Sequence, residues 1–268
     1  MKSLIKVIKE NITNFYLIIR LSLFDLRSSN RNHYLGMLWE VINPMIQIGI
    51  YWFVFGFGIR GGRDVHGVAF LPWMLSGIVA WFFISQSLTT GSKSIYSRLN
   101  IIAKMNFPMS VIPTFVLFSK FYQHLVLLVT IIIILAFNGY TPVIQFLQLP
   151  YIIFANFIFL FSISLVTSTL ATIIRDVQMI IQAIVRVLLY LTPILWTPDN
   201  LPPNVITLLK VNPIYYITEG YRAALLGTEW YFIDHGLYTI YFWVLIFILF
   251  LVGSILHIKF KDRFVDYI

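Results

Sequence analysis

The sequence predicts an all-α membrane protein with six transmembrane helices, and three observations support this fold class. Of the 268 residues, 59% are hydrophobic and only 11% are charged, whereas soluble domains have about 25% charged residues. Residues 65–92, 121–174 and 238–258 contain no charge, and a membrane-spanning helix needs about 20 apolar residues. Because these runs lack the strict alternation of a barrel strand, the spans are expected to be helices.

The N-terminal stretch predicts a helix that lies along the membrane surface. Lysines occupy one side of this helix, and the other side carries apolar residues at helical spacing, namely Leu4, Ile5, Ile8, Ile12, Phe15, Tyr16 and Ile19. A helix packed on a soluble neighbour is the alternative. Because lysines interrupt the apolar residues, no cleavable signal peptide is expected. Residues 1–35 are therefore predicted to form a cytoplasmic interfacial helix and linker.

A six-span domain is expected over residues 36–258, followed by a cytoplasmic tail at 259–268. The predicted spans cover roughly residues 38–58, 68–90, 109–137, 150–174, 177–196 and 237–258. Pro44 lies in the first turns of span one, where a missing amide donor costs least. Between spans five and six, two apolar patches after Pro203 and Pro213 are too short to cross a bilayer. They are expected to form short re-entrant helices on the extracellular side.

The distribution of Lys and Arg predicts the orientation. On the side of the termini the connecting segments carry thirteen such residues, namely Lys2, Lys6, Lys9, Arg20, Arg27, Arg31, Lys93, Arg98, Lys104, Arg175, Lys259, Lys261 and Arg263. The other side has only Arg60, Arg63, Lys210 and Arg222. By the positive-inside rule both termini are expected in the cytoplasm. The net charge of +8 is thus assigned to orientation and to membrane lipids, and no nucleic-acid partner is expected.

Several kinds of site are not indicated by the sequence. The chain has no cysteine, and its five histidines are scattered, so no metal or catalytic site is predicted. Glu40 and Asp176 fall at span ends rather than mid-membrane, which disfavours ion-driven transport. A phosphate-binding G-x-x-x-x-G-K-[ST] loop is also missing, so no nucleotide cofactor is expected in this chain. A six-span chain without an energy source of its own invites a partner that supplies the energy.

Five segments, in order, point to a known family. "RSSNRNHYLGMLWEVINPM", "LNIIAKMNFPMSVIP", "IIRDVQ", "LTPILW" and "VNPIYYITEGYRAALLG" resemble the ABC-2 permeases that export polysaccharides, especially the wall teichoic acid permease. This resemblance implies a homodimer in the cell membrane, paired with two copies of a separate ATPase subunit that binds ATP and Mg. The implied cargo is wall teichoic acid linked to polyprenyl diphosphate.

Two other readings stay open. One is an ABC-2 permease for O-antigen or another lipid-linked polysaccharide. The other, from a different class, is a membrane-embedded transferase of cell-envelope lipid intermediates, which an essential acid or histidine at the interface would support.

The stretch "YSRLNIIAKMNFP" at residues 96–108 predicts a short basic helix between spans two and three. Leu99, Ile102 and Met105 form an apolar stripe at i, i+3 and i+6, with Arg98 and Lys104 beside it. The resemblance implies that this is a coupling helix seated in a groove of the ATPase. A helix on the membrane surface is the alternative. Arg175 and Asp176 resemble a second contact with the ATPase, although a charged pair that ends a helix is an equally simple account.

The resemblance also makes spans one and five gate helices. Candidates for the substrate path or gate are then Trp39, Tyr51, Trp52, Tyr190 and Trp196, whose rings suit sugar stacking. Arg186 lies several residues inside span five, where a cation must snorkel, pair or face water. It is the preferred contact for a phosphate or diphosphate. Glu219 and Arg222 are three residues apart, which favours a local ion pair, and the resemblance places them in extracellular re-entrant helices near the exit.

Overall fold

A computed structural model describes residues 2–31, 34–99, 107–261 and 264 of the chain. Within these ranges the backbone is helical and forms no strand; Val65 and Val68 make one isolated antiparallel bridge. The elements are α1 (Lys2–Thr13), α2 (Phe15–Asn30), η1 (Gly36–Leu38), α3 (Trp39–Tyr51), η2 (Trp52–Ile59), α4 (Phe70–Ser92), η3 (Tyr96–Arg98), α6 (Val111–Phe137), η4 (Ile144–Gln148), α7 (Leu149–Ile173), α8 (Asp176–Leu191), α9 (Pro203–Lys210), α10 (Pro213–Leu226), α11 (Tyr231–Asp234) and α12 (Gly236–Phe260). The predicted all-α class is confirmed for these residues.

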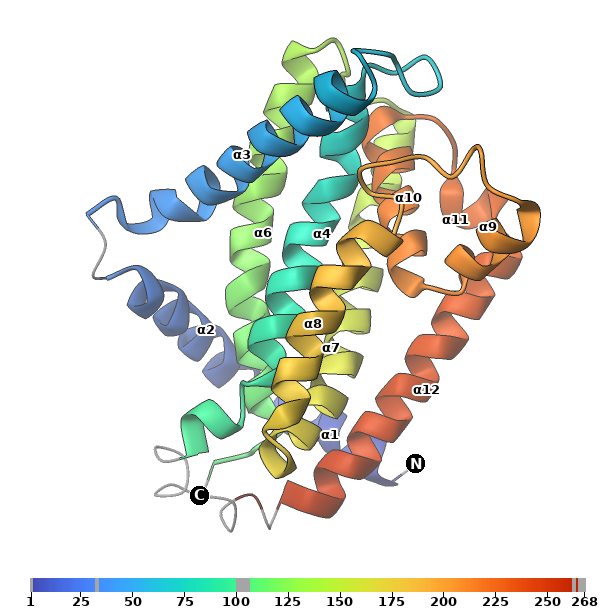
Figure 1. Ribbon diagram of the computed structural model, residues 1–268. Helices are drawn as coiled ribbons and strands as arrows, with labels where there is room; N and C mark the ends of the chain where they lie inside the picture. Colours follow the sequence, from blue (N-terminus) through green and yellow to red (C-terminus); the bar gives the residue numbers. More distant parts are fainter. Residues whose placement is uncertain (1, 32–33, 100–106, 262–263, 265–268) are drawn as a thin grey trace.

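Helix α4 is the centre of the bundle. It packs against α6, α7, α8 and α10, and 83% of its most apolar window is buried inside the chain. A helix that is apolar on every side belongs in the interior, and α4 has no charged residue. Around it, α7 pairs closely with α12 along their lengths (Figure 1).

The first predicted span is the least embedded. It runs as η1, α3 and a π-helical stretch, η2, and only 17% of its apolar window is buried. Figure 1 shows α3 leaning away from α4 and α6 toward the side of α2. Most of α3 therefore offers its apolar surface to lipid or to another molecule.

Five helices are long and apolar enough to cross a membrane, and the expected fifth span is not among them. That segment forms α8, which ends at Leu191 after 16 residues and therefore extends about 24 Å, less than the hydrocarbon thickness of about 30 Å. The helix stops because Thr192 precedes Pro193 and takes an extended conformation with ψ of 135°, as a proline disfavours helical backbone at the residue before it.

The two ends of the bundle carry different connections. Figure 1 places α1, the turn between α7 and α8, and the last turn of α12 at one end. The loop at residues 60–67 and helices α9, α10 and α11 lie at the other end. The two short apolar patches expected between spans five and six are α9 and α10. Of these, α10 is largely buried against α4 and α7.

The N-terminal amphipathic segment is two helices that meet at Asn14. Val7 and Ile18 are buried, while Ile5, Ile12 and Tyr16 are 60%, 71% and 75% exposed. Helix α2 packs on α6, and α1 packs on α12. Much of the apolar side predicted from the sequence is thus left uncovered by the chain itself, as an interfacial helix requires.

Candidate functional site

Local sequence signals set where α10 begins and ends. The side chain of Asn212 accepts a hydrogen bond from the Ile214 amide at 3.0 Å, and Pro213 occupies the first turn, which is a favourable helix start. At the other end Gly227 has φ of 69°, the left-handed conformation typical of a C-terminal cap. The Asn212 amide also donates to Thr192 Oγ1 at 2.8 Å, which ties α10 to the end of α8.

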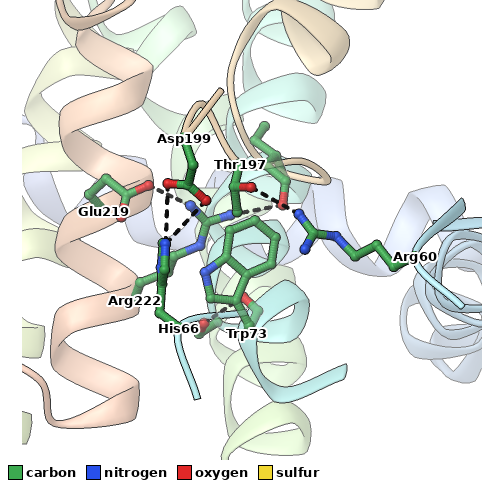
Figure 2. Close-up of polar contacts among 9 residues, drawn as sticks. Arg60, His66, Trp73, Thr197, Asp199, Glu219 and Arg222 are labelled. Carbon is green, nitrogen blue, oxygen red and sulfur yellow. Dashed lines mark hydrogen bonds and ion pairs between the residues drawn. The ribbon is translucent and has the colours of Figure 1, made fainter. Parts of the chain in front are cut away.

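Arg222 on α10 is a buried cation held from several sides (Figure 2). It is 5% exposed and forms an i, i+3 ion pair with Glu219. Its Nη2 donates to the carbonyl of Ile194 at 2.8 Å, and its guanidinium lies 3.8 Å from the ring centre of Trp73. Burial lowers the pKa of Arg222, and the nearby Glu219 carboxylate opposes that shift. Such a network fixes α10 against α4 and the loop after α8.

The approach of Arg222 depends on a glycine in α4. A Cβ at Gly77 would lie 2.9 Å from both Nε and Nη2 of Arg222, closer than such atoms can approach. Gly77 is therefore the residue that lets the guanidinium lie against the Trp73 ring.

Two further contacts join the loop at residues 60–67 to the loop that follows α8. Arg60, directly after η2, donates from Nη2 to Thr197 Oγ1 at 3.0 Å. His66 Nε2 lies 3.2 Å from both carboxylate oxygens of Asp199. Figure 2 shows these two contacts on either side of the Arg222 and Trp73 stack. The loop at residues 60–67 is thus bound to the loop that follows α8.

An open cavity of about 770 Å³ lies between the same two loops. Arg60, Arg63 and one carboxylate, Asp64, share its wall with aromatic or apolar groups such as Leu195 and Trp196. A space of this size accepts a sugar-sized group, and the excess of arginines over carboxylates favours an anionic one.

Two of the predicted gate residues meet at the end of α8. Trp196 donates from Nε1 to the carbonyl of Tyr190 at 2.8 Å. Trp52 is 38% exposed. Trp39 begins α3, twelve residues from Tyr51 and so about 18 Å along the helix. The structure therefore brings Tyr190 and Trp196 together and leaves Trp39 well separated from Tyr51.

Arg186 lies on the open side of α8. Its Nε donates to the carbonyl of Gln182 at 3.3 Å, one turn earlier in the same helix, and Val187 and Tyr190 beside it are 60% and 62% exposed. None of the ion pairs between described residues includes Arg186. Its charge therefore remains available to a group outside the chain.

At the opposite end, the predicted coupling stretch begins with two anchored residues. Arg98 Nη2 donates to Asp25 Oδ1 at 2.6 Å, and Leu99 is 4% exposed in a cluster with Ile95, Val111 and other apolar side chains. Leu99 therefore faces the chain's own core rather than a partner, and it anchors the stretch. Ile102, Lys104 and Met105 lie outside the described residues. Arg175 and Asp176 are exposed at the turn between α7 and α8.

Comparison with known proteins gives the family. A family model described as ABC-2 type transporter matches residues 16–226. The chain belongs to the ABC-2 type transporter family. The O-antigen export system permease protein RfbA of Klebsiella pneumoniae is 28% identical over 256 residues, which cover 94% of this chain and 95% of that protein. RfbA of Myxococcus xanthus is 22% identical over 222 residues, which cover 82% and 84% of the two chains.

The ABC-2 match extends from α2 through the last residue of α10. It thus includes both open helices, α3 and α8, the outer cluster around Arg222 and the anchored Arg98. Sequence reasoning had missed Arg60, His66 and Asp199 in this ABC-2 transporter. Arg60 and His66 are separated from their partners by 137 and 133 positions, and no local spacing indicates such a contact.

Proposed function

We propose that this ABC-2 transporter is the permease subunit of an exporter for a lipid-linked polysaccharide of the O-antigen type. The single observation that carries the proposal is the near-complete coverage by relatives named as O-antigen export permeases. The same observation favours the O-antigen cargo over the teichoic acid cargo expected first from the sequence. A membrane-embedded transferase has no comparable support.

The cargo would pass along the exposed sides of α3 and α8. Both helices carry exposed apolar and aromatic side chains, α8 adds the cation of Arg186, and the cavity after α8 adds Arg60 and Arg63. In this proposal Arg186 attracts the diphosphate or sugar-linked anion at membrane depth, where an unpaired charge needs a partner. Tyr51, Tyr190 and Trp196 then stack against sugar rings near the exit.

Two copies of this chain and two copies of a separate ATPase would form the working exporter. The low burial of α3 supports a second copy, because a surface this apolar needs lipid or protein against it. The exposed Arg175 and Asp176, at the end of the bundle that also carries η3 (Figure 1), are the open charged groups proposed to meet the ATPase. The termini are proposed to lie in the cytoplasm, with α8 as a short sixth crossing.

The test is cargo-specific export in cells. The chain and its ATPase are expressed in a strain that makes an O-polysaccharide but lacks its own permease, and surface polysaccharide is measured by antibody binding to intact cells. We expect surface display that disappears when the ATPase cannot hydrolyse ATP. The same two proteins are also expressed in a second strain, which makes teichoic acid but lacks its teichoic acid permease. Rescue of that strain alone would contradict the proposed cargo.

A further inference from the structure

An apolar groove runs between the N-terminal helices and the bundle. It has a volume of about 210 Å³, and an engineered apolar cavity of about 150 Å³ takes up benzene. Helices α1 and α2 form one wall, and α6 and α7 form the floor and the other wall. The residues that define it are Ile8, Ile12, Phe15, Phe118, Phe157 and Phe161.

The polar side chains in the groove are already satisfied by the protein. Thr114 donates to Asn11 Oδ1 at 2.6 Å, and Asn11 Nδ2 donates to the Val7 carbonyl at 2.9 Å. The rest of the wall is hydrocarbon, including the Phe15 and Phe118 rings, whose centres are 6.0 Å apart. A groove of this kind offers water no partner, so it selects an apolar occupant.

The depth of the groove matches the acyl region of a bilayer. Phe161 lies midway along α7, twelve residues from either end, which is about 18 Å along the helix. The rim is formed by Ile12 and Phe15, which are 71% and 52% exposed. A chain entering from the surface at α1 would thus reach the hydrophobic interior without leaving the groove.

Two exposed cations lie on α1 beside the rim. Lys9 is three residues before Ile12 and Lys6 is three residues before Lys9, so the three side chains follow one another along the helix surface. Glu10, the only acid in α1, is engaged by Ser110 at 2.6 Å and by Lys261 at 3.7 Å. No ion pair between described residues includes Lys6 or Lys9. The entrance is therefore cationic beside an apolar interior.

We infer that this groove binds an acyl chain of an anionic phospholipid from the leaflet next to α1, with the lipid phosphate held by Lys6 and Lys9. The charge at the entrance selects the head group, and the apolar groove holds the chain. The inference concerns a structural lipid rather than the exported cargo, and it does not depend on the proposed function.

Crosslinking with a photoactivatable lipid tests the site. The full chain is reconstituted in phosphatidylcholine nanodiscs that contain phosphatidylglycerol with a diazirine near the middle of one acyl chain. Labelled peptides are then identified by mass spectrometry. We expect labels concentrated at residues 8–15 and 157–161, above those on exposed positions of α12. Ile158→Trp fills the groove and should reduce this labelling about tenfold, the effect of excluding roughly two methylene groups.

A rim variant and a surface control separate groove binding from misfolding. Ile12→Glu changes an exposed side chain and adds an anion at the entrance, so it should lower the labelling without altering the fold. Val129→Trp changes a residue of α6 that is 56% exposed and is not part of the groove wall. It should leave the labelling unchanged.

The double variant Lys6→Gln with Lys9→Gln tests whether the two lysines bind the lipid phosphate. Labelling by phosphatidylglycerol should fall about fivefold for each lysine, while labelling by the matching phosphatidylcholine probe should not change. Labels spread equally over all exposed helices would overturn the inference. So would labelling of both Ile158→Trp and Ile12→Glu at the wild-type level. Displacement of phosphatidylglycerol by a polyprenyl diphosphate probe at equal concentration would overturn it too, because the groove would then belong to the cargo.

Discussion

Arg222 and Gly77 make a matched pair in which the glycine is needed for the position of the arginine. Gly77→Ala would place a methyl group 2.9 Å from the guanidinium and displace it from Glu219 and Trp73. We expect a loss of stability of about 1–3 kcal/mol, measured as a lower melting temperature of the purified protein. Gly49→Ala in α3 is the control, because a Cβ there meets nothing within 4 Å. Equal melting temperatures of the two variants would contradict this account of Gly77.

Replacing Arg186 is expected to reduce transport without reducing stability. Because its side chain is exposed and makes only an intrahelical hydrogen bond, Arg186→Gln should leave the melting temperature and assembly unchanged. Export should fall about tenfold, since hydrogen bonds to charged groups contribute roughly 1.5–3 kcal/mol. Arg186→Lys should retain most of the activity, and Lys210→Gln, which removes an exposed cation from α9, should retain all of it. Wild-type export by Arg186→Gln would remove the residue from the path.

At the scale of elements, the two predicted ATPase contacts differ, because Leu99 in the first is buried whereas Arg175 and Asp176 in the second are exposed. Leu99→Asp would bury a carboxylate among Ile95, Val111 and Phe115, at a cost of several kcal/mol on the order of the usual penalty for an unpaired charge. We expect it to lower the melting temperature of the permease itself. Arg175→Ala with Asp176→Ala should leave that temperature unchanged and reduce copurification of the ATPase. Normal stability of Leu99→Asp would contradict the packing described for this residue.

The helices were largely predictable from the sequence because composition decides them. Five of the six expected spans agree within a few residues with the stretch η1–α3–η2 and with α4, α6, α7 and α12, as long apolar runs leave no other structure in lipid. The expected span at residues 177–196 was predicted too long, because apolarity continues past Thr192 although the helix does not. In the cluster around Arg222, the ion pair with Glu219 was expected from the i, i+3 spacing and is present. The contacts of Arg60 and Asp199 escaped prediction, because only the packing of distant segments brings their partners near.

For the whole molecule, the number of crossings decides where the ends lie. Six crossings put both termini on one side, whereas five would separate them. The chain has no cysteine, so single cysteines at Ser3, Asn204 and Lys261 report separately. With a membrane-impermeant maleimide applied to intact cells, we expect labelling at Asn204 alone. Labelling at Ser3 would reverse the orientation, and labelling at Lys261 but not Ser3 would show that α8 does not cross.

The contrast between the enclosed α4 and the open α3 has a consequence for how this sequence can vary. Shape constrains nearly every position of α4, so even a change by one methylene should be poorly tolerated there. Most positions of α3 need only remain apolar. A map of tolerated substitutions should therefore show α4 as uniformly restrictive and α3 as permissive. Any position on the open side of α3 that resists apolar replacement would then mark a place where export itself imposes selection.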